Sequence, residues 1–104
     1  MRYTLRVTSP ADRDVMHHAK YLVERNPPAA RRFLQAVQKS YDRIRSAPDL
    51  GEVWGEDDAQ GHSCRCWCVR GFEKYVIYFR VLPMSIEILR VLHSAQDAES
   101  KIGS

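Results

Sequence analysis

The chain has 104 residues, of which 44% are hydrophobic and 28% are charged. This length and composition are ordinary for a globular protein, so we expect one domain spanning residues 1–104. No apolar run approaches the roughly 18 residues that a membrane-spanning helix needs, and no signal-peptide pattern opens the chain. We therefore expect a cytoplasmic protein without a membrane partner.

The net charge of +3 is unevenly distributed along the chain. Residues 1–45 carry ten Lys or Arg against four Asp or Glu, whereas residues 46–62 carry no Lys or Arg and five Asp or Glu. The basic residues outnumber the acidic ones again, five to two, in residues 63–93. A basic body with an acidic loop favours an anionic partner, either nucleic acid or an acidic peptide.

The first half of the chain predicts a strand and two helices. Residues 3–7 alternate between apolar and polar, which is typical of a half-buried strand. A helix is predicted to begin at Ser9, which can act as its cap, and to break at residues 26–28. A second helix follows to about Ala47, before Pro48, with an apolar face formed by Ala30, Phe33, Leu34, Val37, Tyr41 and Ile44. Two helices joined by a tight proline turn predict a helical hairpin.

The second half of the chain predicts a sheet. Residues 48–62 are rich in turn formers and are expected to form a loop. Strands are predicted at 64–69, 75–81 and 86–92, with turns at 71–72 and 82–85. The tail from Ser94 to Ser104 is polar and has weak helical character. The order predicts an α+β two-layer domain: an N-terminal strand joins a three-strand antiparallel meander in one sheet, and the antiparallel helical hairpin covers one face.

Three cysteines alternate along one predicted strand at positions 64, 66 and 68, with His62 just before them. Side chains at alternate positions share a face and lie about 6.6 Å apart. This spacing is unsuited to a relaxed disulfide or to tetrahedral zinc, so we interpret the cysteines as reduced, buried small hydrophobic residues. We expect no metal and no cofactor.

Four segments in order resemble the RelE/ParE toxin superfamily, and in particular its ParE branch of plasmid-stabilisation toxins. They are Asn26–Phe33, Ala47–Gly51, Gly71–Phe79 and Ile88–His93, followed by Asp97 at the place of a frequent acidic residue. The resemblance covers about residues 3–97. It implies the toxin of a type II toxin–antitoxin system, held inactive in a hetero-oligomer with an antitoxin of the ParD kind. ParE-like members imply DNA gyrase as the target, whereas RelE-like members imply messenger RNA on the ribosome.

The ribonuclease alternative requires a general base, cations and a general acid in one groove. Its first candidates are Arg65, Arg90 and His93. Arg90 and His93 are separated by an odd offset and would face opposite sides of a regular strand. In the structural alternative, Arg90 snorkels or pairs with an acid, and His93 ends a strand. The absence of Lys and Arg from residues 46–62 also disfavours binding to a phosphate backbone.

Three hypotheses follow from the sequence. The first is a ParE-like gyrase inhibitor that acts by protein binding rather than as an enzyme. The second is a RelE-like endoribonuclease, and the third is a non-toxic relative that only binds an antitoxin. A basic helical hairpin and an exposed sheet edge both suit an acidic partner segment, which can dock as a helix in a groove or add a strand. The candidates for the apolar groove are Val15, Ala19, Leu22 and Phe33, residues that the core also needs.

Overall fold

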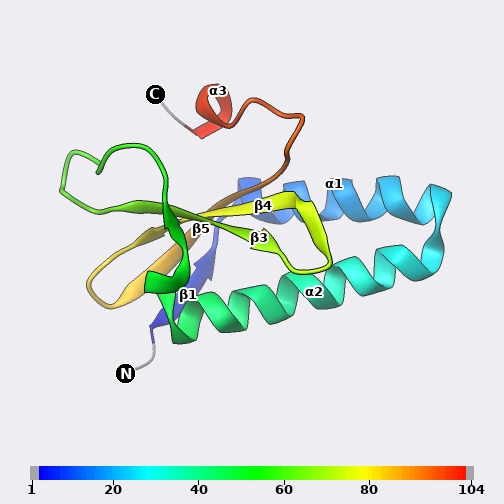
Figure 1. The fold of residues 1–104 in the computed structure, drawn as a ribbon, viewed down its shortest axis with the longest axis horizontal. Coiled ribbons are helices and arrows are strands. Elements are labelled where there is room, and N and C mark those ends of the chain that lie inside the picture. The colour runs from blue at the N-terminus through cyan, green and yellow to red at the C-terminus, as the bar shows by residue number, and fades with distance from the viewer. Residues whose placement is uncertain (1–2, 103–104) are drawn as a thin grey trace.

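A computed structural model describes residues 3–102, in which one five-stranded sheet is covered on one face by two long helices (Figure 1). The helices extend beyond the sheet at one end, so the turn at Asn26 projects from the body of the molecule. In chain order the elements are β1 (Thr4–Val7), α1 (Ser9–Arg25), α2 (Pro27–Ser46), the 3-10 helix η1 (Pro48–Leu50), β2 (Glu52–Val53), β3 (Cys64–Val69), β4 (Phe72–Val81), β5 (Ser85–His93) and α3 (Ala98–Ile102).

The sheet has the strand order β1-β5-β4-β3-β2. β1 runs parallel to β5, and the remaining neighbours are antiparallel. The predicted fold class is confirmed, because the leading strand joins the β3–β4–β5 meander and the helical hairpin packs on one face. β2 falls inside the segment expected to be a loop; it pairs Glu52 with Cys66 and Val53 with Arg65.

Side-chain caps fix both helix starts. Thr8, and not Ser9 as predicted, caps α1, because its side-chain oxygen accepts a hydrogen bond from the backbone N–H of Ala11 at 3.3 Å. Asn26 caps α2 in the same way, accepting from the backbone N–H of Ala29 at 3.2 Å. The tight turn between the helices therefore satisfies backbone groups that would otherwise lack partners.

The core lies between the helical hairpin and the sheet. Alternate residues of the central strands point into it, and the apolar face of α2 covers them. Its largest fully buried side chains are Phe33, Ile44, Ile77, Phe79, Ile86, Ile88, Val69 and Val91. The period-two and helical patterns of the sequence thus meet in one apolar layer.

Several boundaries differ from the prediction; β5, for example, begins at Ser85, which the sequence predicts in a turn. β4 begins at Phe72, which had been placed in a turn, so the turn before it rests on Gly71, whose φ of 86° suits glycine. The helical character predicted for the polar tail is confirmed by the short helix α3, while Gly103 and Ser104 lie outside the described residues. Within residues 3–102, no helix is long and apolar enough to span a membrane.

Candidate functional site

Arg90 lies in β5, and Asp14 of α1 fixes its guanidinium group. Its Nε and Nη2 atoms donate to the two carboxylate oxygens at 2.7 and 2.8 Å. The backbone N–H of Val91 donates to the same carboxylate at 3.0 Å. Asp14 is only 8% exposed, so Arg90 neutralises a buried charge, and the hydrogen bond to Asp14 raises the pKa of Arg90. The predicted pairing of Arg90 with an acid is confirmed.

His93 ends β5 and is held by its own neighbours. Its Nδ1 accepts a hydrogen bond from the backbone N–H of Ala95 at 3.0 Å, and its ring packs edge-on against Tyr75. The sheet register places Arg90 opposite Tyr78 and His93 opposite Tyr75, without a bulge between them. The odd offset predicted for Arg90 and His93 therefore holds in the structure.

Arg65 lies in β3 and does not meet the other two candidates. It stands opposite the buried Phe79, and its Nη1 donates to the carbonyl oxygen of Gly51 at 2.7 Å. β4 separates β3 from β5, so the two strands lie about 10 Å apart. Arg65, Arg90 and His93 therefore share no hydrogen-bond partner among the described residues.

The three cysteines share the face of the sheet that points away from the helices, as the alternation predicted. They lie opposite alternate residues of β4, while Trp67 and Val69, at intervening and following positions, pack toward the core. Only Cys64 is buried as expected; Cys66 is partly buried and Cys68 is exposed, so the expected burial is wrong at Cys68. Burial raises the pKa of Cys64 and of Cys66, which keeps both as protonated thiols at neutral pH. Among residues 3–102 no group of three His, Cys, Asp or Glu side chains is placed to hold a metal ion.

The acidic loop between β2 and β3 is organised around Asp58. Its carboxylate accepts hydrogen bonds from the backbone N–H groups of Gln60 and His62 at 2.9 and 2.8 Å. The bond from His62 is the main reason why the pKa of Asp58 lies below its usual value. Arg80 of β4 adds an ion pair at 3.1 Å. The loop is therefore attached to the sheet by one of its own carboxylates.

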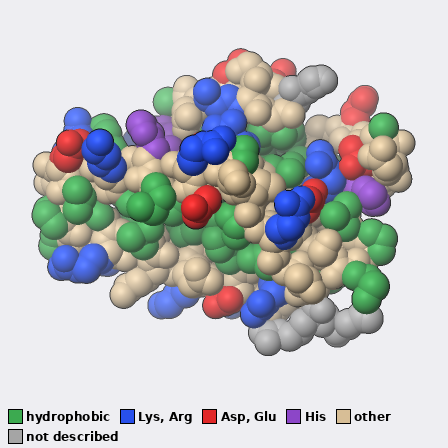
Figure 2. Space-filling model, turned by 180° about the vertical axis from the view of Figure 1, so that it is seen from behind, with side chains coloured by type: hydrophobic (Ala, Val, Ile, Leu, Met, Phe, Trp, Pro, Cys, Tyr) green, Lys and Arg blue, Asp and Glu red, His purple; other side chains and the backbone are tan. Residues whose placement is uncertain are grey.

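An apolar groove of about 570 Å³ crosses the outer face of the helical hairpin. We call it the hairpin groove; it is lined by Met16, His17, Ala19, Lys20, Val23, Ala30, Arg31 and Leu34. Met16, Val23 and Leu34 are 62%, 49% and 41% exposed, although they are large and apolar. Figure 2 shows hydrophobic side chains in a band across this end of the molecule, with Lys and Arg on both sides. An exposed apolar patch with a charged rim is typical of a protein-binding surface.

The sequence prediction of the groove residues was mostly wrong. Val15 and Phe33 belong to the core, and Leu22 packs against it. Of the four candidates, only Ala19 lines the hairpin groove. Both helices carry apolar residues beyond the stripe that the core needs, at Met16 and Leu34, each next in sequence to a core residue. These extra apolar residues were the sequence feature that could have predicted an exposed groove.

Comparison with known proteins places the chain in a family. The model of the family described as "ParE toxin of type II toxin-antitoxin system, parDE" matches residues 5–98. The protein named Toxin RelE1 of Caulobacter vibrioides is 29% identical over 96 residues, which is 92% of this chain and 98% of that protein.

A solved structure described as the chromosomal ParDE TA system from P. aeruginosa has the same fold. The superposition has a TM-score of 0.64 at 20% identity and covers 88% of this chain and 96% of the other. The family match spans nearly the whole chain, and the fold agrees with it. The chain therefore belongs to the ParE toxin family of type II toxin–antitoxin systems.

Proposed function

We propose that this chain inhibits DNA gyrase by binding to it, and that a cognate antitoxin neutralises the chain by docking in the hairpin groove. The observation that carries the proposal is the groove itself, where three large apolar side chains are exposed between two helices. An amphipathic helix can bury its apolar face in such a groove. Acidic residues flanking that face would meet Lys20 and Arg31 on the rim.

The dispersal of Arg65, Arg90 and His93 supports protein binding over ribonuclease chemistry. A nuclease must bring its base, its acid and its phosphate-stabilising cations to one scissile bond. Here Arg90 is committed to Asp14 and Arg65 to a backbone carbonyl. Gyrase as the target rests on the resemblance to the ParE branch. A RelE-like nuclease acting on ribosome-bound message and a non-toxic relative are the alternatives.

Expression from a tightly repressed promoter tests the target. Growth, DNA breaks, supercoiling and message integrity are measured in the same cells. We expect growth arrest with gyrase-dependent DNA breaks and intact message. Message cleavage that is lost in His93→Ala or Arg65→Ala would instead support the nuclease, and continued growth would support the non-toxic relative. Arg90→Ala is a poor test of catalysis, because it leaves the buried carboxylate of Asp14 without its ion-pair partner and so destabilises the fold.

Co-expression with the cognate antitoxin tests the docking surface. The double variant Met16→Glu/Leu34→Glu places two charges in the hairpin groove without touching the core. We expect its affinity for the antitoxin to fall roughly a hundredfold, because two large apolar anchors lose their burial. The variant should remain toxic but escape neutralisation. Met84→Glu changes a methionine that is 77% exposed at another site and should still be neutralised. Equal loss in both variants would contradict the proposed site.

A further inference from the structure

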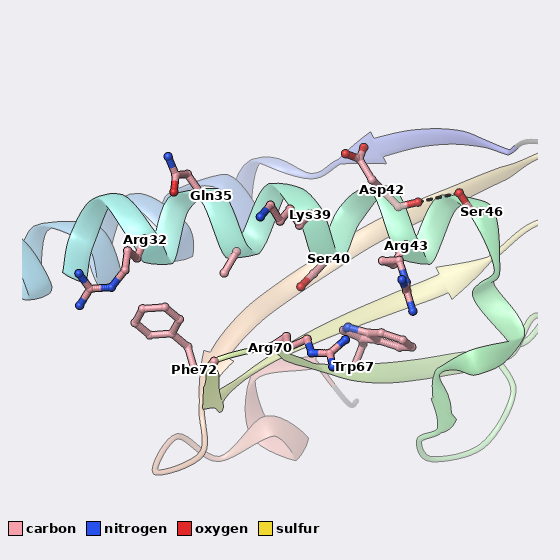
Figure 3. Close-up of a pocket in the computed structure, with 12 residues that line it drawn as sticks. Arg32, Gln35, Lys39, Ser40, Asp42, Arg43, Ser46, Trp67, Arg70 and Phe72 are labelled. Carbon is pink, nitrogen blue, oxygen red and sulfur yellow. Dashed lines mark hydrogen bonds between the residues drawn. The ribbon is translucent and has the colours of Figure 1, made fainter. Parts of the chain in front are cut away.

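A second groove, of about 880 Å³, lies between α2 and the turn that joins β3 to β4 (Figure 3). We call it the basic groove. Arg32, Lys39 and Arg43 of α2 border one wall, and Arg70 of the turn borders the other, with Trp67 of β3 and Phe72 of β4 on either side of it. It is separate from the hairpin groove, because none of its lining residues is shared with that surface.

The four cations of the basic groove are not neutralised within the molecule. Among residues 3–102, none of them makes an ion pair, whereas Arg6, Arg80 and Arg90 each pair with a carboxylate. Asp42 is the one carboxylate among the lining residues, and Figure 3 shows it pointing away from the groove. Three positive charges on one wall and a fourth on the other give the groove a positive potential that attracts an anion.

The spacing of the cations suits a repeating anion. Arg32 and Arg43 are eleven residues apart on one helix, which corresponds to about 16 Å along its axis. A stacked nucleic-acid strand carries one phosphate about every 3.4 Å, so about five phosphates fit this length. Three of the four cations are arginines, whose guanidinium groups bind phosphate oxygens in pairs. With Arg70 on the opposite wall, such a strand would be neutralised from both sides.

Trp67 adds an aromatic surface to the groove. Phe72 already packs edge-on against Phe33 with ring centroids 5.5 Å apart, whereas Trp67 has no aromatic partner among the described residues. Its side chain is only partly buried and borders the groove. Base stacking on an exposed aromatic ring contributes about 1–3 kcal/mol per base and tolerates any sequence.

The acidic loop does not close this groove to an anion. Glu56, Asp57 and Asp58 line a different hollow, together with Cys64 and Arg80. Cys64 and Arg80 lie on the face of the sheet away from the helices, whereas the side chain of Trp67 lies on the helix side. The sheet therefore stands between these three carboxylates and the basic groove.

We propose that the basic groove binds a short single strand of nucleic acid, with phosphates on the four cations and a base stacked on Trp67. An acidic peptide is less well matched, because it would need carboxylates at nearly every position to reproduce this charge density. The inference goes beyond gyrase inhibition and does not depend on it.

The test is a titration of the full chain with a fluorescein-labelled twelve-residue oligothymidylate, followed by anisotropy at several salt concentrations. Four phosphate contacts predict a slope of about −2.8 for the logarithm of the association constant against the logarithm of salt. Arg43→Gln/Arg70→Gln should halve this slope. If the variant and the parent chain bind equally at 1 M salt, the variant should then bind roughly 25-fold more weakly than the parent at 0.1 M salt. In a Trp54→Phe background, the emission of Trp67 should be quenched by the oligonucleotide.

The matched control is Arg13→Gln/Lys101→Gln, which removes the same charge outside the groove and should change the slope only slightly. Circular dichroism checks that each variant is folded. An equal slope in the two double variants would overturn the proposal. So would the same affinity and the same quenching of Trp67 with a twelve-residue oligoglutamate, which would assign the groove to an acidic peptide. Because only the isolated chain is used, failure here is distinct from failure of the gyrase proposal.

Discussion

Gly51 shows how one missing side chain positions a strand. Its φ is −72°, which any residue can adopt, so the requirement for glycine is spatial. A Cβ atom built on Gly51 would lie 2.6 Å from Cζ of Phe79 and 3.2 Å from the carbonyl oxygen of Cys66. Phe79 is fully buried and cannot move aside easily. Gly51 thereby lets the chain pass close to the sheet just before β2, where its carbonyl also receives Arg65.

We predict that Gly51→Ala destabilises the fold by about 1–3 kcal/mol, the usual cost of overpacking a core. The measurement is urea unfolding followed by circular dichroism. Asp49→Ala, two residues earlier and exposed, is the control and should leave the midpoint nearly unchanged. A variant as stable as the parent would mean that η1 and β2 shift without cost.

At the scale of elements, β3 presents three thiols with graded exposure. Cys64 is buried, Cys66 is partly buried and Cys68 is exposed. Burial also raises the pKa of Cys64 and Cys66, so little reactive thiolate is present at either position. The strand therefore offers one accessible thiol, although all three side chains lie on the same face of the sheet.

We predict that iodoacetamide at pH 7.5 alkylates Cys68 first and Cys64 last, as read by mass spectrometry of the digested chain. Cys68→Ser should remove the fast phase and leave the slow phases unchanged. In denaturing urea all three should react alike. Rapid labelling of Cys64 in the native chain would contradict the burial of this end of β3.

The sequence predicted the long elements because each carries its own periodic pattern. α2 has a complete apolar stripe, β4 is β-branched or aromatic over most of its length, and β5 is rich in Ile, Leu and Val. β2 was not predicted, because a strand of two residues is too short to show an alternating pattern. It is a strand only because it pairs with β3. Asp14 was missed for a similar reason, since its partners Arg90 and Val91 are more than 70 residues away.

The candidate site was less predictable than the fold. Periodicity identifies a helix face that is apolar, but it does not say how much of that face the sheet covers. Val15 is buried and its neighbour Met16 is 62% exposed, so one step around α1 separates the core from the hairpin groove. The basic groove joins α2 to Arg70 at the β3–β4 turn, a contact that arises only after folding.

The molecule as a whole contains a buried histidine that couples stability to pH. His18 is 6% exposed, and its Nε2 donates to the carbonyl oxygen of Val91 at 2.8 Å. Burial lowers the pKa of His18 from 6.5, while the bond to Val91 and the charge of Asp14 oppose this. His17 and His93 add small effects in the same direction as burial. The unfolded chain therefore binds this proton more tightly than the folded chain does.

Because the pKa of His18 is lower in the folded chain than in the unfolded chain, its protonation does not reduce the free energy of unfolding above about pH 6.5. Below this pH, the free energy of unfolding falls as the pH drops toward the lowered pKa. Each tenfold difference in proton affinity corresponds to about 1.4 kcal/mol. We predict a lower urea midpoint at pH 5.5 than at pH 7.5. His18→Gln should flatten this dependence, whereas His17→Gln, at an exposed neighbour, should retain it. An equal slope in both variants would assign the pH dependence to other groups.

The pairing of β1 with β5 also determines when the sheet can be completed during synthesis. The strand made first waits for the strand made last, because β1 has its sheet neighbour only once Ser85–His93 have left the ribosome. The helical hairpin leaves the ribosome long before that moment, because Ser9–Ser46 precede β5 in the chain. A translation product that stops before β5 lacks the strand that joins both ends of the sheet. Interrupted synthesis therefore yields no finished toxin, because the core face of the hairpin then lacks the buried residues that β5 supplies.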